Sequence, residues 1–526
     1  MAVAKLLEPA ETGLTVTPPG TVADVREAEG RTAEAARGHL KRKTARGVVV
    51  STATQAGLFV LRTGSLLVLA RILLRSDFGV VNMATAFIGF FGLARDGLSM
   101  GAVQRTSVTR EQTSNLFWVN LGVGGALALL TALISPLLAS FYGEPRLRRV
   151  VLYLATILIF NSAGAQHRAM LQRGMRFAAL AAIDLLSWTF SIAVGIGMAV
   201  AGFGYWSLVA MMVGQPAAAA LGVWLSSGWI PGWPSRQSGV RSMLAYGGAI
   251  SLNSFIAYVA YNADKVLVGR FWGADALGMY GRAYQLINLP NENLNTTIGL
   301  VAFPAMARVH EDPRQLANYF SKGFRIFASL TTPLLIGCAL FAGDIILVAL
   351  GPKWTEATRT FRLLVPAIWG LTFVNPFGWL MLARGLARRC IAIAVIVTPI
   401  VLVSYGLGLK YGPEGVAAAF SIAMLLSIPP VVFWARHGTL ITMRDILRAA
   451  TPAAVAIGVS ILLTFAVQSW ITGLHPGLIR LIGESTVFFG SYSLTLLYAM
   501  KQKATYVELL REIGLWPSGS RVSVHA

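Results

Sequence analysis

Two stretches in the second half of the chain place polar side chains at helical spacing within apolar segments. The first has polar groups at i, i+3, i+4 and i+7, namely Tyr258, Tyr261, Asn262 and Lys265. The next apolar segment carries a similar set at i, i+4, i+8 and i+11, namely Tyr284, Asn288, Glu292 and Asn295. In an α-helix each set lies on one face. Because lipid disfavours such a face, the two stripes predict a water-filled cavity between helices.

The residue types in these stripes suit a particular class of ligand. Tyrosine rings offer a sugar a stacking surface, and asparagine amides donate and accept hydrogen bonds. Lysine and arginine bind phosphate oxygens through charge-assisted hydrogen bonds. We therefore assign substrate binding to nine residues, which are Arg62, Arg95, Tyr258, Tyr261, Asn262, Lys265, Arg282, Tyr284 and Asn288.

Acidic residues in apolar segments are candidates for ion coupling, because a charge inside a membrane costs free energy unless it has a partner or a role. Asp264 and Glu292 lie in the two striped segments and are assigned to this role. A structural alternative stays open for Asp264 and Lys265, which would then neutralise other charges in the bundle. Arg95 and the aspartate after it could likewise have a structural role, as charges paired with a neighbouring group. Asp184 stands alone in its segment and is interpreted as a packing group.

The segments that must position these groups are long and apolar. The chain has 526 residues, of which 55% are hydrophobic and 13% are charged, whereas a soluble domain has roughly a quarter charged. The uncharged runs from Gln112 to Gly143 and from Ala449 to Ile479 exceed the ~20 residues that a helix needs to cross a bilayer. The composition therefore predicts an all-α polytopic membrane protein.

About fourteen membrane spans can be counted. Their predicted limits are 47–70, 77–103, 114–140, 147–167, 178–201, 204–229, 243–270, 276–303, 320–343, 357–383, 387–409, 413–435, 446–470 and 478–500. We expect two six-helix lobes and two extra C-terminal helices. The predicted parts are a disordered basic cytoplasmic tail (1–46), an N-lobe of spans 1–6 (47–240), a C-lobe of spans 7–12 (241–440), spans 13–14 (441–500) and a second cytoplasmic tail (501–526).

A repeated corner relates the two lobes. Residues 70–88 align with residues 269–287 at an offset of 199, which is 278 − 79, the separation of Gly79 and Gly278. In both copies an apolar run ends at an arginine, and the glycine opens the next run. Six spans per lobe give both lobes the same orientation, which implies a parallel pseudo-two-fold repeat about the membrane normal. We expect the corners to be structural hinges on the outer face.

The net charge of +21 indicates membrane orientation, because the cations gather in short loops on one side of the predicted spans. By the positive-inside rule, that side and both termini are cytoplasmic. The charge therefore does not predict a nucleic-acid partner. Two cysteines, six scattered histidines and the lack of P-loop or HExxH motifs predict no cofactor, no metal site and no enzyme activity.

Several short motifs resemble those of bacterial polysaccharide transporters. In the first half they are ARILLRSDFGVVNMATAFIGFF (70–91), VQR (103–105), LFWVN (116–120), FYGEP (141–145), LQR (171–173) and GFGYW (202–206). In the second half they are DKVLVGR (264–270), LGMYGRAYQL (277–286) and FPAMAR (303–308). Residues 45–435 are thus similar to the Wzx-type lipid-linked oligosaccharide flippases of the multidrug/oligosaccharidyl-lipid/polysaccharide exporter superfamily. The resemblance implies two lobes around a central cavity, alternating access, and cavity cations that hold a pyrophosphate.

The sequence as a whole predicts a flippase for polyprenyl-pyrophosphate-linked oligosaccharide repeat units in the bacterial inner membrane, serving exopolysaccharide or O-antigen biosynthesis. The expected partners are that lipid-linked glycan, membrane lipids, a polysaccharide polymerase and a chain-length regulator. The alternatives are a cation-coupled drug exporter of the same superfamily, a peptidoglycan-precursor flippase, and a membrane glycan polymerase or ligase. The exporter would have twelve spans and an acidic cavity, and the polymerase would need a larger outer loop than those predicted.

Overall fold

A computed structural model describes residues 54–103, 109–234, 241–471, 477–504 and 506–507. For residues 93–103, 241–257, 260–261 and 468–471 it gives the course of the helix without the side chains. The predicted N-terminal tail and most of the predicted C-terminal tail lie outside the described residues.

The described residues fold almost entirely into helices. The first helix is Thr54–Ile72. It is followed by α2 (Arg75–Val103), α3 (Arg110–Tyr142), α4 (Arg146–Arg173), α5 (Phe177–Val200), α6 (Tyr205–Ser227), α7 (Arg241–Arg308), α8 (Pro313–Leu340), α9 (Ala342–Ala349), η1 (Pro352–Trp354), α10 (Ala357–Ala383), α11 (Ala387–Leu409), α12 (Gly412–Arg436), α13 (Met443–Ile471), α14 (Leu478–Leu494) and the π-helical η2 (Thr495–Ala499). The prediction of an all-α protein is confirmed.

Ten helices in the described part are long and apolar enough to cross a membrane. They include the first helix, α3 to α6, α8, α10 to α12 and most of α13. The chain is therefore a multi-pass membrane protein, as its composition predicts. Since α2, α7 and α14 are not among the ten, the count of fourteen spans stays a prediction.

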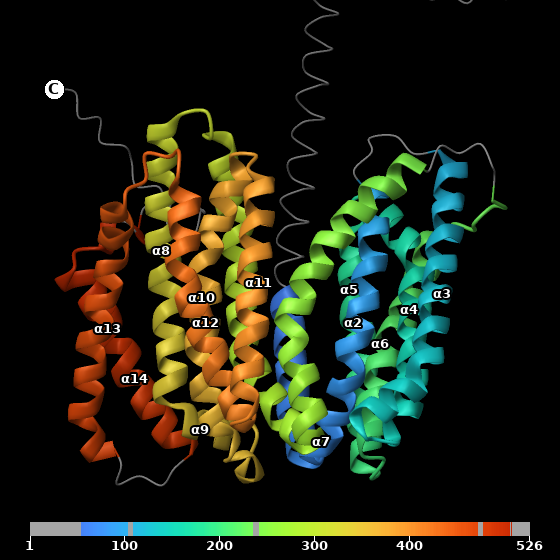
Figure 1. The fold of residues 1–526 in the computed structure, drawn as a ribbon, viewed down its shortest axis with the longest axis horizontal. Coiled ribbons are helices and arrows are strands. Elements are labelled where there is room, and N and C mark those ends of the chain that lie inside the picture. Colours follow the sequence, from blue (N-terminus) through green and yellow to red (C-terminus); the bar gives the residue numbers. More distant parts are fainter. Residues whose placement is uncertain (1–53, 104–108, 235–240, 472–476, 505, 508–526) are drawn as a thin grey trace, which may run out of the picture.

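The helices form two bundles, with α2 to α6 in one and α8 to α14 in the other (Figure 1). In the first bundle α3 packs on α4 and α5 packs on α6, and in the second α10 and α11 pack on α12. The long element α7 packs against α2 on one side and against α10 and α11 on the other. It therefore joins the two bundles and contributes to both.

α7 consists of two helices that meet at Gly273. This glycine has φ 79° and ψ −176°, a conformation that is not helical and that a residue without a Cβ adopts at little cost. We call the residues before it α7a (241–272) and those after it α7b (274–308). The break lies between the predicted spans 243–270 and 276–303, so the second repeated corner is present where the sequence places it.

The two repeated corners pack directly against each other. A Cβ built on Gly79 would lie 1.7 Å from the carbonyl oxygen of Ala274, and one built on Gly278 would lie 2.0 Å from that of Arg75. The offset of 199 relates both glycines to each other and both carbonyls to each other. The contact is therefore reciprocal, as at an interface with two-fold symmetry. Only glycine allows the backbones to approach this closely.

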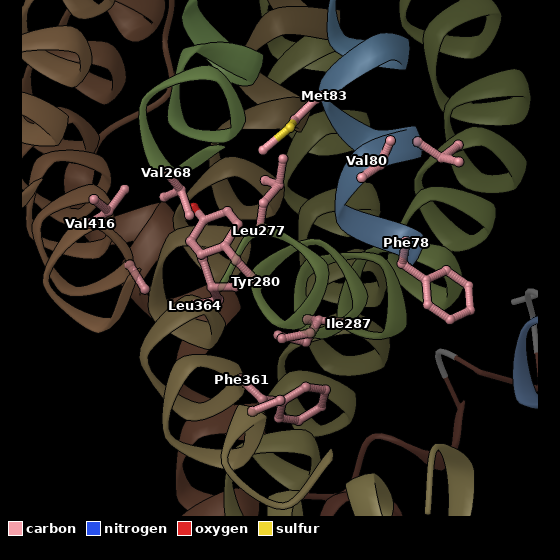
Figure 2. Packing of buried hydrophobic residues seen from close by; sticks show 14 of the residues in the cluster. Phe78, Val80, Met83, Val268, Leu277, Tyr280, Ile287, Phe361, Leu364 and Val416 are labelled. Atoms are coloured by element: carbon pink, nitrogen blue, oxygen red, sulfur yellow. The ribbon is translucent and has the colours of Figure 1, made fainter. Parts of the chain in front are cut away.

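The hydrophobic core continues through this contact. Val268 on α7a, Leu277 and Tyr280 on α7b, and Phe361 and Leu364 on α10 lie within one cluster (Figure 2). All five side chains are fully buried. This packing fixes the two halves of α7 as an antiparallel pair, and so it sets which polar residues of the two halves face each other.

An ion pair joins the second bundle at the point where the predicted ninth span is least regular. Asp344 lies in the first turn of α9 and accepts hydrogen bonds from Arg480 Nε at 2.8 Å and from the backbone N–H of Gly477 at 3.1 Å. Its side chain is almost fully buried. This contact with the start of α14 accounts for a carboxylate that interrupts the apolar run.

Candidate functional site

A polar cavity of about 660 Å³ lies between α2, the two halves of α7 and α10. Its lining is rich in amides, with six asparagines at positions 82, 262, 288, 291, 295 and 375. Two tyrosines, two threonines and one glutamine add further hydrogen-bonding groups. The cavity therefore offers a hydrated ligand many donors and acceptors.

The cavity brings together the two polar stripes found in the sequence. The predicted site residues in its lining are Tyr258, Asn262, Lys265, Tyr284, Asn288 and Glu292. They meet because α7a and α7b run side by side after the break at Gly273. Their location in one cavity is a feature of the structure, and their role in substrate binding stays a prediction.

Lys265 is the one cation among the lining residues that the structure describes. Its Nζ donates a hydrogen bond of 2.7 Å to Asn262 Oδ1, one turn earlier on α7a. The same ammonium lies 4.9 Å from the centroid of the Tyr284 ring on α7b, within the range of a cation–π contact. An ammonium has three N–H donors, so Lys265 can hold an anionic ligand while Asn262 and Tyr284 keep it in position.

α7b and α10 are linked by amide hydrogen bonds at the wall of the cavity. Thr372 Oγ1 donates to Asn291 Oδ1 at 2.8 Å, and Asn375 Nδ2 donates to Asn295 Oδ1 at 2.9 Å. Sequence reasoning missed Asn291, Thr372 and Asn375. A polar side chain inside an apolar segment is the sequence feature that could have identified them, because such a group needs a hydrogen-bond partner within a membrane.

On the α2 side the cavity is closed by contact with Tyr258. The tyrosine hydroxyl donates a hydrogen bond of 3.1 Å to the carbonyl of Ala86. A Cβ on Gly89 would lie 2.2 Å from that hydroxyl oxygen, so the glycine makes room for the ring. Asn82 and Thr85 on the same helix line the cavity and were also missed from the sequence.

Two predicted cationic site residues lie outside the cavity lining. The Arg62 guanidinium lies 4.3 Å from the centroid of the Trp188 ring of α5, within the first bundle. Arg282 lies 4.4 Å from the centroid of the Phe78 ring of α2. On a helix, Arg282 is rotated by roughly 200° from Tyr284 two residues later, which directs the two side chains to different neighbours.

Asp264 is buried in the core and does not line the cavity. Its Oδ2 accepts a hydrogen bond of 2.7 Å from the Tyr280 hydroxyl, and its Oδ1 has no hydrogen-bond partner among the described residues. Tyr280 is the labelled ring near the centre of Figure 2. The carboxyl group thus lies in the packing between α7a and α7b.

Three other residues that the sequence analysis singled out remain to be placed. The side chains of Arg95 and Tyr261 lie outside the described part. The interpretation of Asp184 as an isolated packing group is wrong, because Arg168 on α4 donates two hydrogen bonds to its carboxylate, at 2.8 and 2.7 Å. The partner is sixteen residues away on another helix, so periodicity within one segment does not reveal it.

A set of contacts, which we call the clamp, holds the end of the first helix near the corner. Lys353 Nζ donates hydrogen bonds to two backbone carbonyls, that of Leu73 and that of Arg71, the latter at 3.0 Å. Trp354 Nε1 donates a hydrogen bond of 2.9 Å to the carbonyl of Ala70. Partial burial lowers the pKa of Lys353, and the charge of Asp77 opposes this shift. These carbonyls end a helix and lack partners within it, so the second half of the chain caps a helix of the first.

Two further contacts complete the clamp. Arg71 Nη2 donates to the carbonyl of Val348, in the last turn of α9, at 2.6 Å. Arg75 forms a 2.7 Å ion pair with Glu356. The corner end of the molecule is thus tied together across the two bundles by residues far apart in the sequence.

The charges of the cavity limit its chemistry. Among the described lining residues there is one cation, Lys265, and one anion, Glu292. Within the part of the chain that the structure describes, no group of three or more His, Cys, Asp or Glu is arranged to hold a metal ion. The cavity is suited to binding a polar ligand through many hydrogen bonds and one fixed positive charge.

Comparison with known proteins places this architecture in a family. The model of a family described as "Polysaccharide biosynthesis protein" matches residues 68–359, which is more than half of the chain. The chain belongs to this polysaccharide biosynthesis family. The matched region includes α2 and the whole of α7. The resemblance to polysaccharide transporters that the short motifs indicate is therefore confirmed.

Curated relatives extend the match. The teichuronic acid biosynthesis protein TuaB of Bacillus subtilis (strain 168) is 28% identical over 343 residues, covering 64% of this chain and 69% of that protein. The lipopolysaccharide biosynthesis protein WzxC of Escherichia coli (strain K12) is 24% identical over 352 residues, covering 66% and 71%. The succinoglycan biosynthesis transport protein ExoT of Rhizobium meliloti (strain 1021) is 22% identical over 320 residues, covering 61% and 65%.

Solved structures share the fold. The lipid II flippase MurJ in an inward closed conformation aligns with a TM-score of 0.69 at 14% identity, covering 89% of this chain and 99% of that chain. An inward-facing multidrug resistance transporter of the MATE family aligns with a TM-score of 0.58 at 13% identity, covering 75% and 96%. At these identities the likeness establishes the fold.

Proposed function

We propose that this protein is a flippase that carries polyprenyl-pyrophosphate-linked oligosaccharide units across a membrane by alternating access. The observation that carries the proposal is the amide-rich cavity between α2, α7 and α10, with Lys265 as its described cation. Membership of the polysaccharide biosynthesis family supports a glycan as the cargo. Relatives named for teichuronic acid, lipopolysaccharide and succinoglycan biosynthesis support the same class of substrate.

The cavity addresses the physical difficulty of this transport. A glycan and its pyrophosphate lose their hydrogen bonds with water in hydrocarbon, which costs several kcal/mol for each unsatisfied group. Asparagine, tyrosine and threonine side chains replace those bonds, and the Lys265 ammonium offsets phosphate charge. The polyprenyl chain is as apolar as the bilayer, so it can stay in lipid beside the bundles while the head group moves.

The proposal includes an orientation and a location. Cations concentrate in the loops after α2, α4, α6, α7b, α10 and α12. The positive-inside rule therefore favours a cytoplasmic side for these loops and for both termini. The membrane is the bacterial inner membrane, where polyprenyl-linked glycans are assembled. The corner and the clamp are then extracytoplasmic.

The two lobes (47–240 and 241–440) are the proposed moving parts, and spans 13–14 (441–500) are the proposed accessory part.

The direction of transport follows from charge. Moving an anion outward is favoured by an inside-negative potential, by about 2.3 kcal/mol per charge per 100 mV. Coupling to a proton or sodium ion through Asp264 or Glu292 would add to this. Flipping in vesicles that is indifferent to both a pH gradient and a sodium gradient would exclude the coupling and leave the flippase function in place.

The related MATE-type fold raises a second candidate, a cation-coupled drug exporter. Six asparagines and one lysine in the cavity favour a glycan over a cationic drug. The test is reconstitution of the purified chain into vesicles with two cargoes, a polyprenyl-pyrophosphate tetrasaccharide and the drug cation ethidium. We expect the flipped fraction of the glycan to exceed that in empty vesicles, with no movement of ethidium. Transport of ethidium alone would favour the exporter.

A flippase of this kind works between other steps of polymer synthesis. Glycosyltransferases must supply the lipid-linked unit on one side of the membrane, and a polymerase with a chain-length regulator would consume it on the other. We propose these two as functional partners. Accumulation of unpolymerised lipid-linked glycan in a strain lacking this protein, and its relief by the wild-type gene, would support the order.

A further inference from the structure

The cavity is electrically polarised along α7b. Lys265 contacts the Tyr284 ring at one level of this helix. Glu292 lies eight residues beyond Tyr284, which corresponds to about 12 Å along the axis at 1.5 Å per residue. The only described cation and the only described anion of the lining therefore lie at separate levels, and no ion pair between them is found among the described residues.

Glu292 is exposed within the cavity lining and is held by one neighbour. Asn288 Nδ2 donates to Glu292 Oε1 at 2.6 Å, one turn earlier on the same helix. The closest cation of the lining, Lys265, is already engaged with Asn262 and Tyr284. A ligand that reaches past Lys265 thus meets a carboxylate whose charge no described cation neutralises.

The wall beside Glu292 is built for uncharged polar groups. The Asn291 and Asn295 oxygens accept hydrogen bonds from Thr372 and Asn375 of α10, which fixes the orientation of these amides. Amides held in this way can donate to and accept from hydroxyl and acetamido groups of a sugar. They carry no net charge, so they cannot neutralise an acidic sugar.

From these observations we propose that Glu292 makes the cavity selective for glycans without a carboxylate. The pyrophosphate binds at the level of Lys265, and neutral sugars bind along the asparagines up to Glu292. A uronic acid at that level would bring two carboxylates close together in a confined cavity, and like charges at such short range repel each other. This inference rests on the proposed flippase function and adds the substrate class that the site accepts.

The test compares one neutral synthetic lipid-linked glycan with two acidic ones, each of which differs from it by one carboxylate. All three are polyprenyl-pyrophosphate tetrasaccharides that end in galactose. The neutral glycan has glucose at the second and third positions, and each acidic glycan has glucuronic acid at one of these positions. Dissociation constants are measured for the detergent-solubilised protein, in which no ion gradient exists, at one fixed pH and sodium concentration. Flipping in vesicles is followed by external galactose oxidase, which reaches the terminal galactose only in the outer leaflet.

We expect the wild-type protein to bind the neutral glycan at least tenfold more tightly than the acidic glycan at one of the two positions. Glu292→Gln removes the charge and keeps the side-chain size, and it should reduce that ratio to below about threefold. Glu311→Gln changes an exposed glutamate in the loop after α7b and should leave the ratio as in the wild type.

The outcomes separate the inference from the function on which it rests. Equal affinity of the wild type for the neutral and the two acidic glycans, or a ratio that Glu292→Gln does not change, would overturn the selectivity proposal while glycan binding and flipping stand. Absence of binding and of flipping for every glycan would overturn the flippase function, and the selectivity proposal with it.

Discussion

Replacing Lys353 with alanine should open the corner end of the molecule. Its Nζ donates to two backbone carbonyls at the end of the first helix, those of Arg71 and Leu73. In the proposed transport cycle the corner is the outer end of the cavity, so it must separate before the glycan can leave. The clamp is then the set of contacts that favours the closed corner over the open one.

The size of the effect follows from these two hydrogen bonds. Hydrogen bonds that involve a charged group are worth about 1.5–3 kcal/mol each. Lys353 is only half-buried, and water replaces part of what is lost when the corner opens. We therefore expect a net change of about 2 kcal/mol for both bonds together, which corresponds to a shift of about 30-fold toward the open corner.

Distance measurements between spin labels can detect this shift. Suitable label sites are Arg149 at the start of α4 and Lys410 after α11, which are exposed and lie on different bundles. The two native cysteines, Cys338 and Cys390, would first be replaced by alanine. Lys353→Ala should add a population at longer distance to the distribution of the parent protein.

Arg359→Ala is the matched control, because it removes a cation near the corner without touching the clamp. Arg359 is highly exposed and only weakly paired, with Glu414 at 3.8 Å. An unchanged distance distribution in Lys353→Ala, or the same longer population in Arg359→Ala, would refute the role of the clamp.

Three other predictions concern the corner, the cavity wall and the charge at a loop. Gly79→Ala should lower the yield of folded protein sharply, because the new Cβ would lie 1.7 Å from a backbone oxygen and overpacking typically costs about 1–3 kcal/mol or more. Gly64→Ala is the control and should be tolerated, because a Cβ there would meet no atom within 4 Å. Equal yields of the two variants would contradict this explanation. Thr372→Val leaves the Asn291 oxygen without its 2.8 Å donor, so affinity for a neutral glycan should fall about five- to thirtyfold, and unchanged affinity in a titration would exclude that amide from the site. The side-chain hydrogen bond from Arg146 holds the pKa of Glu144 below its ordinary 4.5, so its stabilising effect is present above pH 4.5 and lost as the pH falls through the lowered pKa. In thermal unfolding, the wild type should therefore be more stable than Glu144→Gln by less than about 1 kcal/mol at pH 7, and the two should be equally stable below the lowered pKa. A stability difference that grows as the pH falls would contradict the lowered pKa.

The parts of the site that the sequence predicts are those with a local pattern. Tyr258, Asn262 and Lys265 repeat at helical spacing, and Tyr284 and Asn288 do so after the break. Periodicity fixes which side chains share a face. The structure places residues of both faces in one cavity, and their role in substrate binding stays a prediction.

The parts that the sequence could not predict depend on contacts between distant segments. Asn375 is a single amide on α10, and its bond to Asn295 has no periodic signal. Arg62 and Arg282 have the residue type of a phosphate ligand, yet each lies over an aromatic ring in the tertiary structure. Helix position alone does not distinguish a cation that faces a cavity from one that packs on a ring.

Lys265 offers the most direct test of the proposed function. The measurement is the rate at which the reconstituted protein flips a neutral polyprenyl-pyrophosphate tetrasaccharide across the vesicle membrane. Lys265→Met removes the cavity cation, and Lys503→Met removes a lysine that also lies over a tyrosine ring, 5.6 Å from the Tyr498 centroid, but outside the cavity. Because a charged hydrogen bond to phosphate is worth about 1.5–3 kcal/mol, the flipping efficiency of Lys265→Met should fall by about ten- to a hundredfold, while that of Lys503→Met stays at the wild-type level. Equal flipping by the two variants would contradict a cavity that holds the pyrophosphate through Lys265.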